Sequence, residues 1–339
     1  MGIVTLYSVR APAWTVTYRG VAITSRIETM VLSIIYTAPA GGAAPDLEIE
    51  LEDRDKRWQG PWFPQRGDLV DVSIGYKNEA LAPCPSFQVD EVELKGAPDV
   101  VHLRCLAAYI TDAMRTPNSV SYDGQTLLQA AKTIATKYGF SLNGAAVNPD
   151  VSFACLRQNQ ESDLEFLQRI AGEHNYEFTV RGTRMVFYSR PALEQRPAAG
   201  ILHRGDVLSF NFKAKTHRIY KAAQINYFDP VTKLLITHTA EASPPVPTGD
   251  TIKLIRRCEN GQQAALKAQA ELHRRNMLQA TSTLEIPGNV AMTGGVIVTL
   301  DGWGTYDGNY FISTARHKLS RSAGFTTELE ARSLSFSNG

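Results

Sequence analysis

The alternation of apolar and polar side chains through the first hundred residues is the feature that most constrains this fold. Leu47, Ile49 and Leu51 alternate with acidic residues, and the run from Val70 to Tyr76 alternates in the same way. Successive side chains of a strand point to opposite faces, so the pattern predicts half-buried strands. Because glycine- and proline-containing turns at 40–42 and 96–99 separate the runs, we expect an antiparallel sheet that closes on itself. We assign residues 1–112 to a first tube-like β-barrel.

The pattern changes to helical spacing near residue 112. The segment "YDGQTLLQAAKTIATKYGF" repeats apolar residues every three or four positions, with Asp123 available as N-cap and Gly139 as C-terminal stop. A second helix is expected to begin near Ser162, followed by a hairpin around "RGT". Residues 113–200 are therefore predicted to be a small α/β insert domain.

Strands return in the last part of the chain, residues 201–339. We expect a second tube-like β-barrel there, with a helix near 260–278 and a loop near 241–250, where "EASPPVPTGD" is rich in turn formers. The predicted class is thus α+β, mainly β, with two antiparallel barrels flanking an α/β insert.

Three closing segments echo three opening ones in the same order. "GDLVDV", "FQVDEVE" and "VVHLRCLA" correspond to "GGVIVTL", "YFISTARH" and "TTELEARS". The order suggests an internal duplication, although any two antiparallel meanders share such a pattern.

An acidic cluster in "QNQESDLEFLQRIAGEHNYEF" is the first candidate for chemistry. It contains Glu161, Asp163, Glu165, Glu173 and His174. Two carboxylates that cleave a glycosidic bond face each other across a sugar, about 5–9.5 Å apart, and are best held on separate elements. These are neighbours in sequence.

A structural explanation accounts for the start of this cluster. Ser162 and Glu165 have the spacing of a capping box, in which each side chain bonds the other residue's backbone N–H. Asp163 adds negative charge at the positive end of the helix dipole. We therefore predict a helix start and assign no catalytic residue.

Other polar groups give no stronger signal. Asp53 and Asp55 alternate with basic neighbours and are expected to lie on a solvated strand end. The four cysteines and seven histidines are dispersed, without C-x-x-C or H-E-x-x-H, so we predict reduced, buried thiols, no metal and no cofactor. No G-x-S-x-G or phosphate-binding glycine loop occurs.

The charge balance limits the classes of partner. Thirty-five basic and 34 acidic residues give a net charge of +1, which predicts no specific nucleic-acid binding. The longest apolar run is far shorter than the ~20 residues that span a bilayer, so we expect no membrane insertion and a soluble chain made in a cytoplasm.

Large aromatic residues stand out in "RWQGPWFPQRGDLV". Trp58, Trp62 and Phe63 lie among glycines and prolines, a combination that is costly to expose. We interpret them as packing anchors in the chain, or as interface anchors for a partner.

Four segments together resemble the late control protein D family, the baseplate hub of contractile phage tails and tail-like bacteriocins. They are "RWQGPWFPQRGDLVDVSIGY", "YDGQTLLQAAKTIATKYGF", "QNQESDLEFLQRIAGEHNYEF" and "GNYFISTARHKLSRSAGFTTELEARS". The E-S-D-L-x-F-L-x-R-I run is also similar to the hub portion of type VI secretion spike proteins. Those proteins continue into a β-helical needle, which this sequence lacks, so the resemblance implies a separate spike.

The resemblance implies a non-enzymatic structural role and a homotrimer that adapts a sixfold tail tube to a threefold spike. Implied partners are the tail tube protein, the central spike protein, the baseplate wedge proteins and the tape-measure protein. The implied location is the host bacterial cytoplasm during assembly, and then the virion or tail-like particle. The implied insert fold is similar to the lysin motif.

Two alternatives stay open at this point. A tail-associated peptidoglycan-degrading protein would use Glu161, Asp163 or Glu173, and a glycan-binding module would use Trp58 and Trp62 as a stacking platform.

Overall fold

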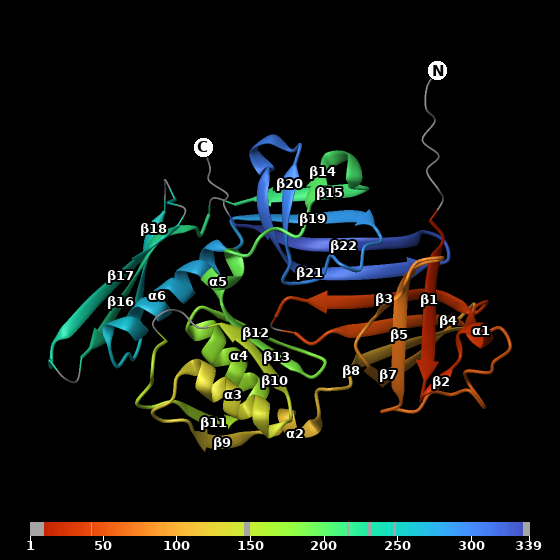
Figure 1. Cartoon of the computed structure of the whole chain (residues 1–339), viewed down its shortest axis with the longest axis horizontal. Coiled ribbons are helices and arrows are strands. Elements are labelled where there is room, and N and C mark those ends of the chain that lie inside the picture. The colour runs from red at the N-terminus through yellow and green to blue at the C-terminus, as the bar shows by residue number, and fades with distance from the viewer. Residues whose placement is uncertain are drawn as a thin grey trace.

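A large β-sheet dominates the computed structural model, which describes residues 10–41, 43–145, 150–215, 217–229, 232–243, 245–246 and 249–334. This 14-stranded sheet includes the strand order β15-β19-β22-β21-β3-β4-β8-β7-β5-β1-β2 and crosses the top and right of Figure 1. Strands outnumber helices among the described residues, so the predicted α+β, mainly β class is confirmed.

The N-terminal strands form one half of this sheet. They are β1 (Pro12–Tyr18), β2 (Val21–Ala22), β3 (Val31–Pro39), β4 (Asp46–Glu52), β5 (Leu69–Tyr76), β6 (Ala82–Pro83), β7 (Phe87–Lys95) and β8 (Val100–Ala107), with the one-turn helix α1 (Thr24–Ile27). Leu47, Ile49 and Leu51 are buried while the residues between them are partly exposed, which confirms the predicted alternation.

The middle of the chain forms an α/β layer below the sheet (Figure 1). Its elements are α2 (Asp112–Arg115), β9 (Asn118–Ser121), α3 (Leu127–Lys137), β10 (Ser141–Ala145), β11 (Arg157–Glu161), α4 (Asp163–Glu173), β12 (Tyr176–Arg181), β13 (Arg184–Ser189) and α5 (Arg190–Glu194). Strand β13 pairs with β10 in parallel and with β12 antiparallel. Ile134 of α3 and Phe166 of α4 share one buried core with Phe187 of β13.

The N-terminus of α3 differs from the prediction. Thr126, not Asp123, is the N-cap, and it forms a capping box with Gln129. Asp123 lies one turn earlier, where its Oδ1 accepts a hydrogen bond from the backbone N–H of Leu156 at 2.9 Å. Gly139 follows the helix with φ of 70°, as expected of a stop that favours glycine.

The C-terminal strands complete the large sheet. They are β14 (Ile201–His203), β15 (Ser209–Ala214), β19 (Ala280–Pro287), β20 (Ile297–Asp301), β21 (Gly308–Ser320) and β22 (Gly324–Ser333), with the 3-10 turns η1 (Arg204–Asp206) and η2 (Gly304–Tyr306).

A separate side layer lies between β15 and β19 in sequence. It consists of β16 (Tyr220–Phe228), β17 (Leu235–Glu241), β18 (Asp250–Ile255) and α6 (Gly261–Asn276), at the left of Figure 1. The strands form a sheet of their own, in which β16 pairs antiparallel with β17 and in parallel with β18. The helix expected near 260–278 is thus present as α6. Of the loop expected near 241–250, residues 244, 247 and 248 lie outside the described residues.

Strand pairing repeats between the two halves of the large sheet. The antiparallel pairs β3–β4, β4–β8, β8–β7 and β7–β5 correspond in chain order to β15–β19, β19–β22, β22–β21 and β21–β20. The predicted duplication is confirmed at this level. The repeat ends at the outer strands, because β1 pairs antiparallel with β5 whereas β14 pairs in parallel with β20.

Backbone details of the two halves also coincide. Gly67 and Gly295 both have φ of 86°, and their N–H groups donate at 2.7 Å to the carbonyls of Val89 and Ile312, respectively. The register shift that follows Val89 in the β7–β8 pair recurs after Ile312 in the β21–β22 pair. A shared bulge position fixes the alignment of the halves residue by residue.

Pairing between β3 and β21 joins the halves. The register runs from Thr314 opposite Pro39 to Ser320 opposite Ser33. The two predicted barrels therefore correspond to two halves of one sheet, and pairing among the described strands closes neither half into a barrel.

A buried histidine lies in this junction. His317 is 0% exposed and stacks on Tyr36, with ring centroids 5.6 Å apart. Its Nδ1 lies 3.0 Å from Oγ1 of Thr327. Burial lowers the pKa of His317 to about 4, from an ordinary value of 6.5. Between pH 6.5 and 4 the unfolded chain therefore binds a proton at His317 that the folded chain does not. The free energy of unfolding falls through this residue as the pH drops from about 6.5 towards 4.

We expect wild-type protein to lose about 2 kcal/mol of unfolding free energy through His317 between about pH 7.5 and pH 5. His317→Phe keeps a ring against Tyr36 and is expected to remove that share of the pH dependence. Urea unfolding at both pH values measures it, with the exposed His203→Gln as control. Equal pH dependence in His317→Phe and wild type would contradict the assignment.

Candidate interaction surfaces

Asp163 holds together the two helices of the α/β layer. Its side chain is 1% exposed, and Oδ2 accepts hydrogen bonds from Lys137 Nζ at 2.7 Å and Tyr138 Oη at 2.6 Å. Oδ1 accepts from Gln158 Nε2 at 2.8 Å. Burial raises the pKa of Asp163, but these three hydrogen bonds outweigh it and leave the pKa below its ordinary value. Such a carboxylate stays ionised and is poorly suited to donate a proton.

Glu161 and Glu173 share one cation. Arg169 donates to both carboxylate oxygens of Glu161, at 2.6 Å from Nη2 and 3.0 Å from Nε, and its Nη1 lies 3.5 Å from Glu173 Oε1. The hydrogen bond to Glu161 is the main cause of a raised pKa for Arg169. The two carboxylates converge on one guanidinium rather than facing each other across a cleft.

Ser162 and Glu165 bond each other at the start of α4. Ser162 Oγ accepts from the N–H of Glu165 at 3.2 Å, and Glu165 Oε2 accepts from the N–H of Ser162 at 2.8 Å. The bond from this backbone N–H lowers the pKa of Glu165. The pair satisfies two backbone donors that the first helical turn leaves free.

His174 ends the same helix as a buried, neutral group. Burial lowers its pKa to about 4, and its Nδ1–H donates to the carbonyl of Ile170 at 2.8 Å. The ring packs edge-on against Phe153 at 4.9 Å between centroids. This environment is that of a core histidine.

The aromatic anchors differ in exposure. Trp58 is 7% exposed in the core of the N-terminal half, and half-buried Trp62 packs edge-on against it at 5.6 Å between centroids. The guanidinium of Arg57 lies 5.2 Å from the ring centroid of Trp62. Phe63, by contrast, is 51% exposed. A flat sugar-stacking surface would need Trp58 to be open, and it is enclosed.

Asp53 supports the turn that carries these aromatics. It is 2% exposed, and its Oδ1 accepts from the N–H of Trp58 at 3.1 Å while Oδ2 accepts from Gln59 Nε2 at 3.2 Å. The prediction of a solvated strand end is therefore wrong for Asp53, because the turn folds back and gives its carboxylate backbone and amide donors. It holds for Asp55, which is exposed.

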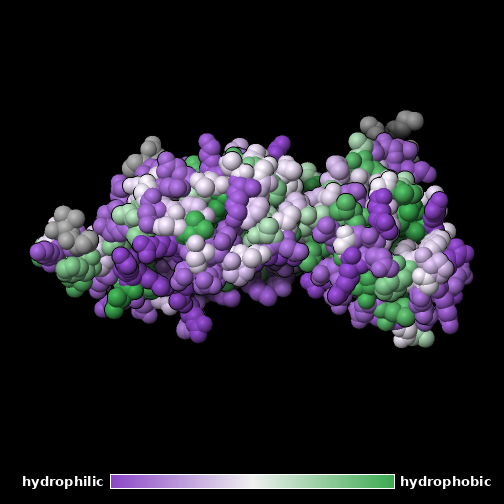
Figure 2. Space-filling model, turned by 90° about the horizontal axis from the view of Figure 1, so that it is seen from below, coloured by the Kyte–Doolittle hydropathy of each residue, from purple (hydrophilic) through white to green (hydrophobic). Residues whose placement is uncertain are grey.

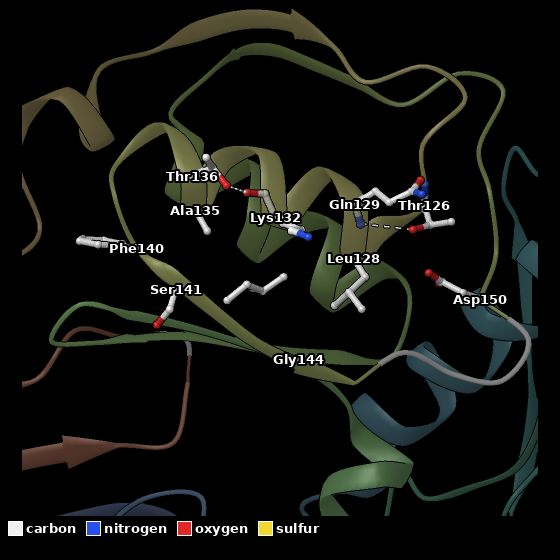
Figure 3. A pocket seen from close by; sticks show the side chains of 11 residues that line it. Thr126, Leu128, Gln129, Lys132, Ala135, Thr136, Phe140, Ser141, Gly144 and Asp150 are labelled. Carbon is white, nitrogen blue, oxygen red and sulfur yellow. Dashed lines mark hydrogen bonds between the residues drawn. The ribbon is translucent and has the colours of Figure 1, made fainter.

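A cavity of about 450 Å³ lies between α3 and β10. Figure 3 shows Leu128 and Lys132 reaching from α3 towards the strand, with Asp150 across the opening. Phe140 is the only aromatic residue among those that line it in the described part of the chain. The lining mixes scattered polar side chains with a single aromatic ring, so it does not define a ligand class.

Exposed apolar side chains gather at several places. Figure 2 shows a mainly hydrophilic lower face with green patches over the N-terminal half at its right. Large exposed residues include Val21, Phe63, Leu69 and Leu94 in that half, Leu208 and Phe210 near β15, and Phe228, Leu234, Leu235 and Ile255 at one end of the side layer. Such positions on a folded chain favour contacts with partner proteins.

The described residues offer little for other chemistry. They contain no group of three or more His, Cys, Asp or Glu side chains placed to bind a metal, and none of their helices has the length and apolar character to cross a membrane. All four cysteines are free thiols. Cys105 and Cys258 are buried as predicted, but Cys84 is half-buried and Cys155 is exposed, so the prediction was wrong for Cys155.

Comparisons with known proteins give the relatives of this chain. No family model matches it. It is 34% identical over 165 residues to the probable baseplate hub protein of Escherichia phage P2, and 29% identical over 177 residues to that of Escherichia phage 186. The chain is similar in sequence to phage baseplate hub proteins. The predicted resemblance is thereby confirmed. The matches cover 49% and 52% of this chain but only 42% and 45% of those relatives, respectively, so it spans less than half of their length.

Solved structures share the fold over nearly the whole chain. The 43 kDa tail protein of prophage MuSo2 from Shewanella oneidensis superposes with a TM-score of 0.73 at 14% identity, over 95% of this chain and 98% of that one. A type VI secretion system component of E. coli superposes with a TM-score of 0.59 at 12% identity, over 94% and 77%. The fold of this chain is therefore shared with proteins that retain little sequence identity to it.

Sequence reasoning missed the open strand edges near Phe210 and Leu94. Both strands contain alternating signals, "SFNFKAK" and "DEVELK". What marks the two edges is an exposed apolar side chain on each strand. Its exposure becomes visible only when the order of the strands in the sheet is known.

Asp163→Asn is expected to lower the free energy of unfolding by about 2 kcal/mol, because it weakens a charge-assisted hydrogen bond of a buried group. Glu173→Gln, which alters a half-exposed contact at 3.5 Å, should change it by less than about 0.5 kcal/mol. Denaturant unfolding of both variants tests this. Similar losses in the two would contradict the anchoring role of Asp163.

Proposed function

We propose that this protein is a structural baseplate hub of a contractile tail or tail-like particle. It acts as a homotrimer that adapts a sixfold tail tube to a threefold spike. The observation that carries the proposal is the repeated strand pairing, because three chains present six similar docking surfaces only if each chain contains two.

The side chains of the acidic cluster support a non-enzymatic role. Asp163 is tied to Lys137, and Glu161 to Arg169, within hydrogen-bond distance. Neither arrangement leaves a carboxylate free to act as general acid. A pKa raised towards neutrality, which that role requires, is opposite to the lowered pKa of Asp163.

The proposed organisation has three domains. Residues 1–112 and 201–339 provide the ring, and residues 113–200 form the insert, which resembles a lysin-motif fold. The side layer with α6 belongs to the last domain in sequence but packs as a separate core around Ile225 and Leu272. Its exposed apolar end suits a contact with wedge or tube proteins.

The net charge fits a conduit. A value of +1 gives no strong field to retain nucleic acid or a tape-measure protein during passage. Assembly in the host cytoplasm and residence in the tail baseplate follow from the proposed role.

Imaging of a tail particle that contains this chain is expected to show three copies around the axis, with six similar β units. Copy number from quantitative mass spectrometry provides a second readout. A count other than three, or a single β unit per chain in the ring, would overturn the adapter role.

Purified protein is expected to leave a peptidoglycan suspension turbid, because Asp163 and Glu161 of the acidic cluster are held by Lys137 and Arg169 rather than facing each other across a sugar. Lysozyme serves as the positive control, and Glu161→Gln and Glu173→Gln as matched variants. Clearing by wild type that either variant abolishes would instead establish the tail-associated lytic protein.

A further inference from the structure

Two edges of the large sheet remain open among the described strands. Strand β15 pairs with β19 on one side and with no described strand on the other. In β7, β5 reaches only Phe87 and Gln88, which leaves the edge from Glu91 to Lys95 unpaired on that side. Open edges carry free backbone N–H and C=O groups and readily accept another strand.

The repeat shows that these edges correspond to a pair that already meets inside the chain. By its pairing, β15 takes the place of β3, and β7 takes the place of β21. Strands β3 and β21 form the junction between the halves. Their counterparts β15 and β7 lie at different places in the same chain and lack that partner.

We propose that β15 of one copy of this chain pairs antiparallel with β7 of the next copy, in the register of the β3–β21 junction. The inference rests on the proposed function, since the ring it builds is the proposed hub. It adds which edges meet and which residues lie opposite each other.

The known junction fixes the central pair. Thr37 lies opposite Arg316. Lys213 occupies the position of Thr37. Thr37 lies opposite Asp46 of β4, Lys213 lies opposite Thr281 of β19, and Asp46 and Thr281 are equivalent in the repeat. Glu93 occupies the position of Arg316, two residues beyond the end of the shared bulge. The inferred interface therefore sets Lys213 opposite Glu93.

The next pair on the same face has the same charge pattern. Pro39 lies opposite Thr314 in the junction. Their counterparts are Lys215 and Glu91, so a second lysine faces a second glutamate. Opposite charges placed directly across two strands stabilise their pairing.

Charges at these positions are available to a partner. Lys213, Lys215 and Glu91 are exposed and form no ion pair with any described residue. Glu93 has only an exposed contact with Lys95 at 3.0 Å and a longer one with His102 at 3.8 Å.

The other face of the inferred pairing is apolar. Phe212 takes the position of Tyr36, and Leu94 takes that of His317, the two rings that stack in the junction. Leu94 is 51% exposed. Phe210, which lies two residues before Phe212 on the same face of β15, is 43% exposed. Pairing would cover both, as the junction covers Ile34 and Leu319.

The contact is head-to-tail, because each copy offers β15 to one neighbour and β7 to the other. Such contacts build a ring when the rotation from one copy to the next closes, and an open filament otherwise. With three copies the ring has six junctions, three within chains and three between them.

Site-directed disulfide formation tests the register. Directly opposed residues have Cα atoms about 4.5–5.5 Å apart, within the reach of a disulfide. Full-length Glu93→Cys/Lys213→Cys, in a Cys155→Ser background, is oxidised with diamide and examined on a non-reducing gel. We expect covalent dimers and trimers that reductant abolishes.

A matched double variant checks specificity. Glu91→Cys/Asn211→Cys places the thiols on the same face but four residues out of register, roughly 13 Å apart along the strands, and should give none of these bands. Bands from this variant equal to those of the first would overturn the register. Absence of bands from the first variant would overturn the edge pairing.

Mass photometry of wild type separates this inference from the proposed function. A trimer without the Glu93–Lys213 cross-link overturns only the edge pairing. The cross-link in an assembly of another size supports the edge pairing and overturns the threefold hub. Neither cross-link nor assembly, even with tail components co-expressed, overturns both.

Charge reversal gives an independent readout. Lys213→Glu/Lys215→Glu is expected to weaken self-association about tenfold or more, and adding Glu91→Lys/Glu93→Lys should restore it. Lys253→Glu/Arg256→Glu, an equal charge change on the exposed side layer, serves as control. If Glu91→Lys/Glu93→Lys did not restore the self-association lost in Lys213→Glu/Lys215→Glu, the proposed charge pairs would be wrong.

Discussion

The antiparallel pairing of β3 with β21 is the constraint on which the rest of the structure depends. It joins strands nearly three hundred residues apart in sequence, from Ser33 opposite Ser320 to Pro39 opposite Thr314. Leu319 and Phe325 of the C-terminal half pack into the core of the N-terminal half. Without this pairing the two halves would be separate sheets.

A junction of this kind carries information about association. When a chain contains two similar units joined edge to edge, the junction uses one edge of each unit. The equivalent of each used edge stays unpaired on the other unit. The edge near Lys213 and the edge near Glu93 are these remainders. The two edges are complementary in charge on one face and both apolar on the other, although their residues differ from those at the junction.

Much of the fold could be predicted from the sequence because the local signals are strong. Alternation around Ile49 identified strands, and the spacing of Ser162 and Glu165 identified a helix start. The cap of α3 was misassigned because Asp123 and Thr126 are both good caps, and only the turn before the helix decides between them. Burial of Asp53 depended on a long-range fold of the Trp58 turn, which no local pattern encodes.

The open edges could not be predicted in the same way. A residue such as Leu94 looks like any core position of a strand, and its exposure follows from which strand is absent beside it. Strand order is set by contacts between distant segments, so a single sequence gives the strands but not their neighbours.

Two departures from the repeat bear on the proposed match between sixfold and threefold symmetry. The α/β layer lies between β8 and β14, and the side layer lies between β15 and β19, where the N-terminal half has only a short connection from Pro39 to Asp46. Neither insertion interrupts the paired strands of the repeat. In a three-chain ring the repeated strands occur six times and each insertion three times. A neighbour that docks on the strands alone would meet sixfold order, and one that docks on an insertion would meet threefold order.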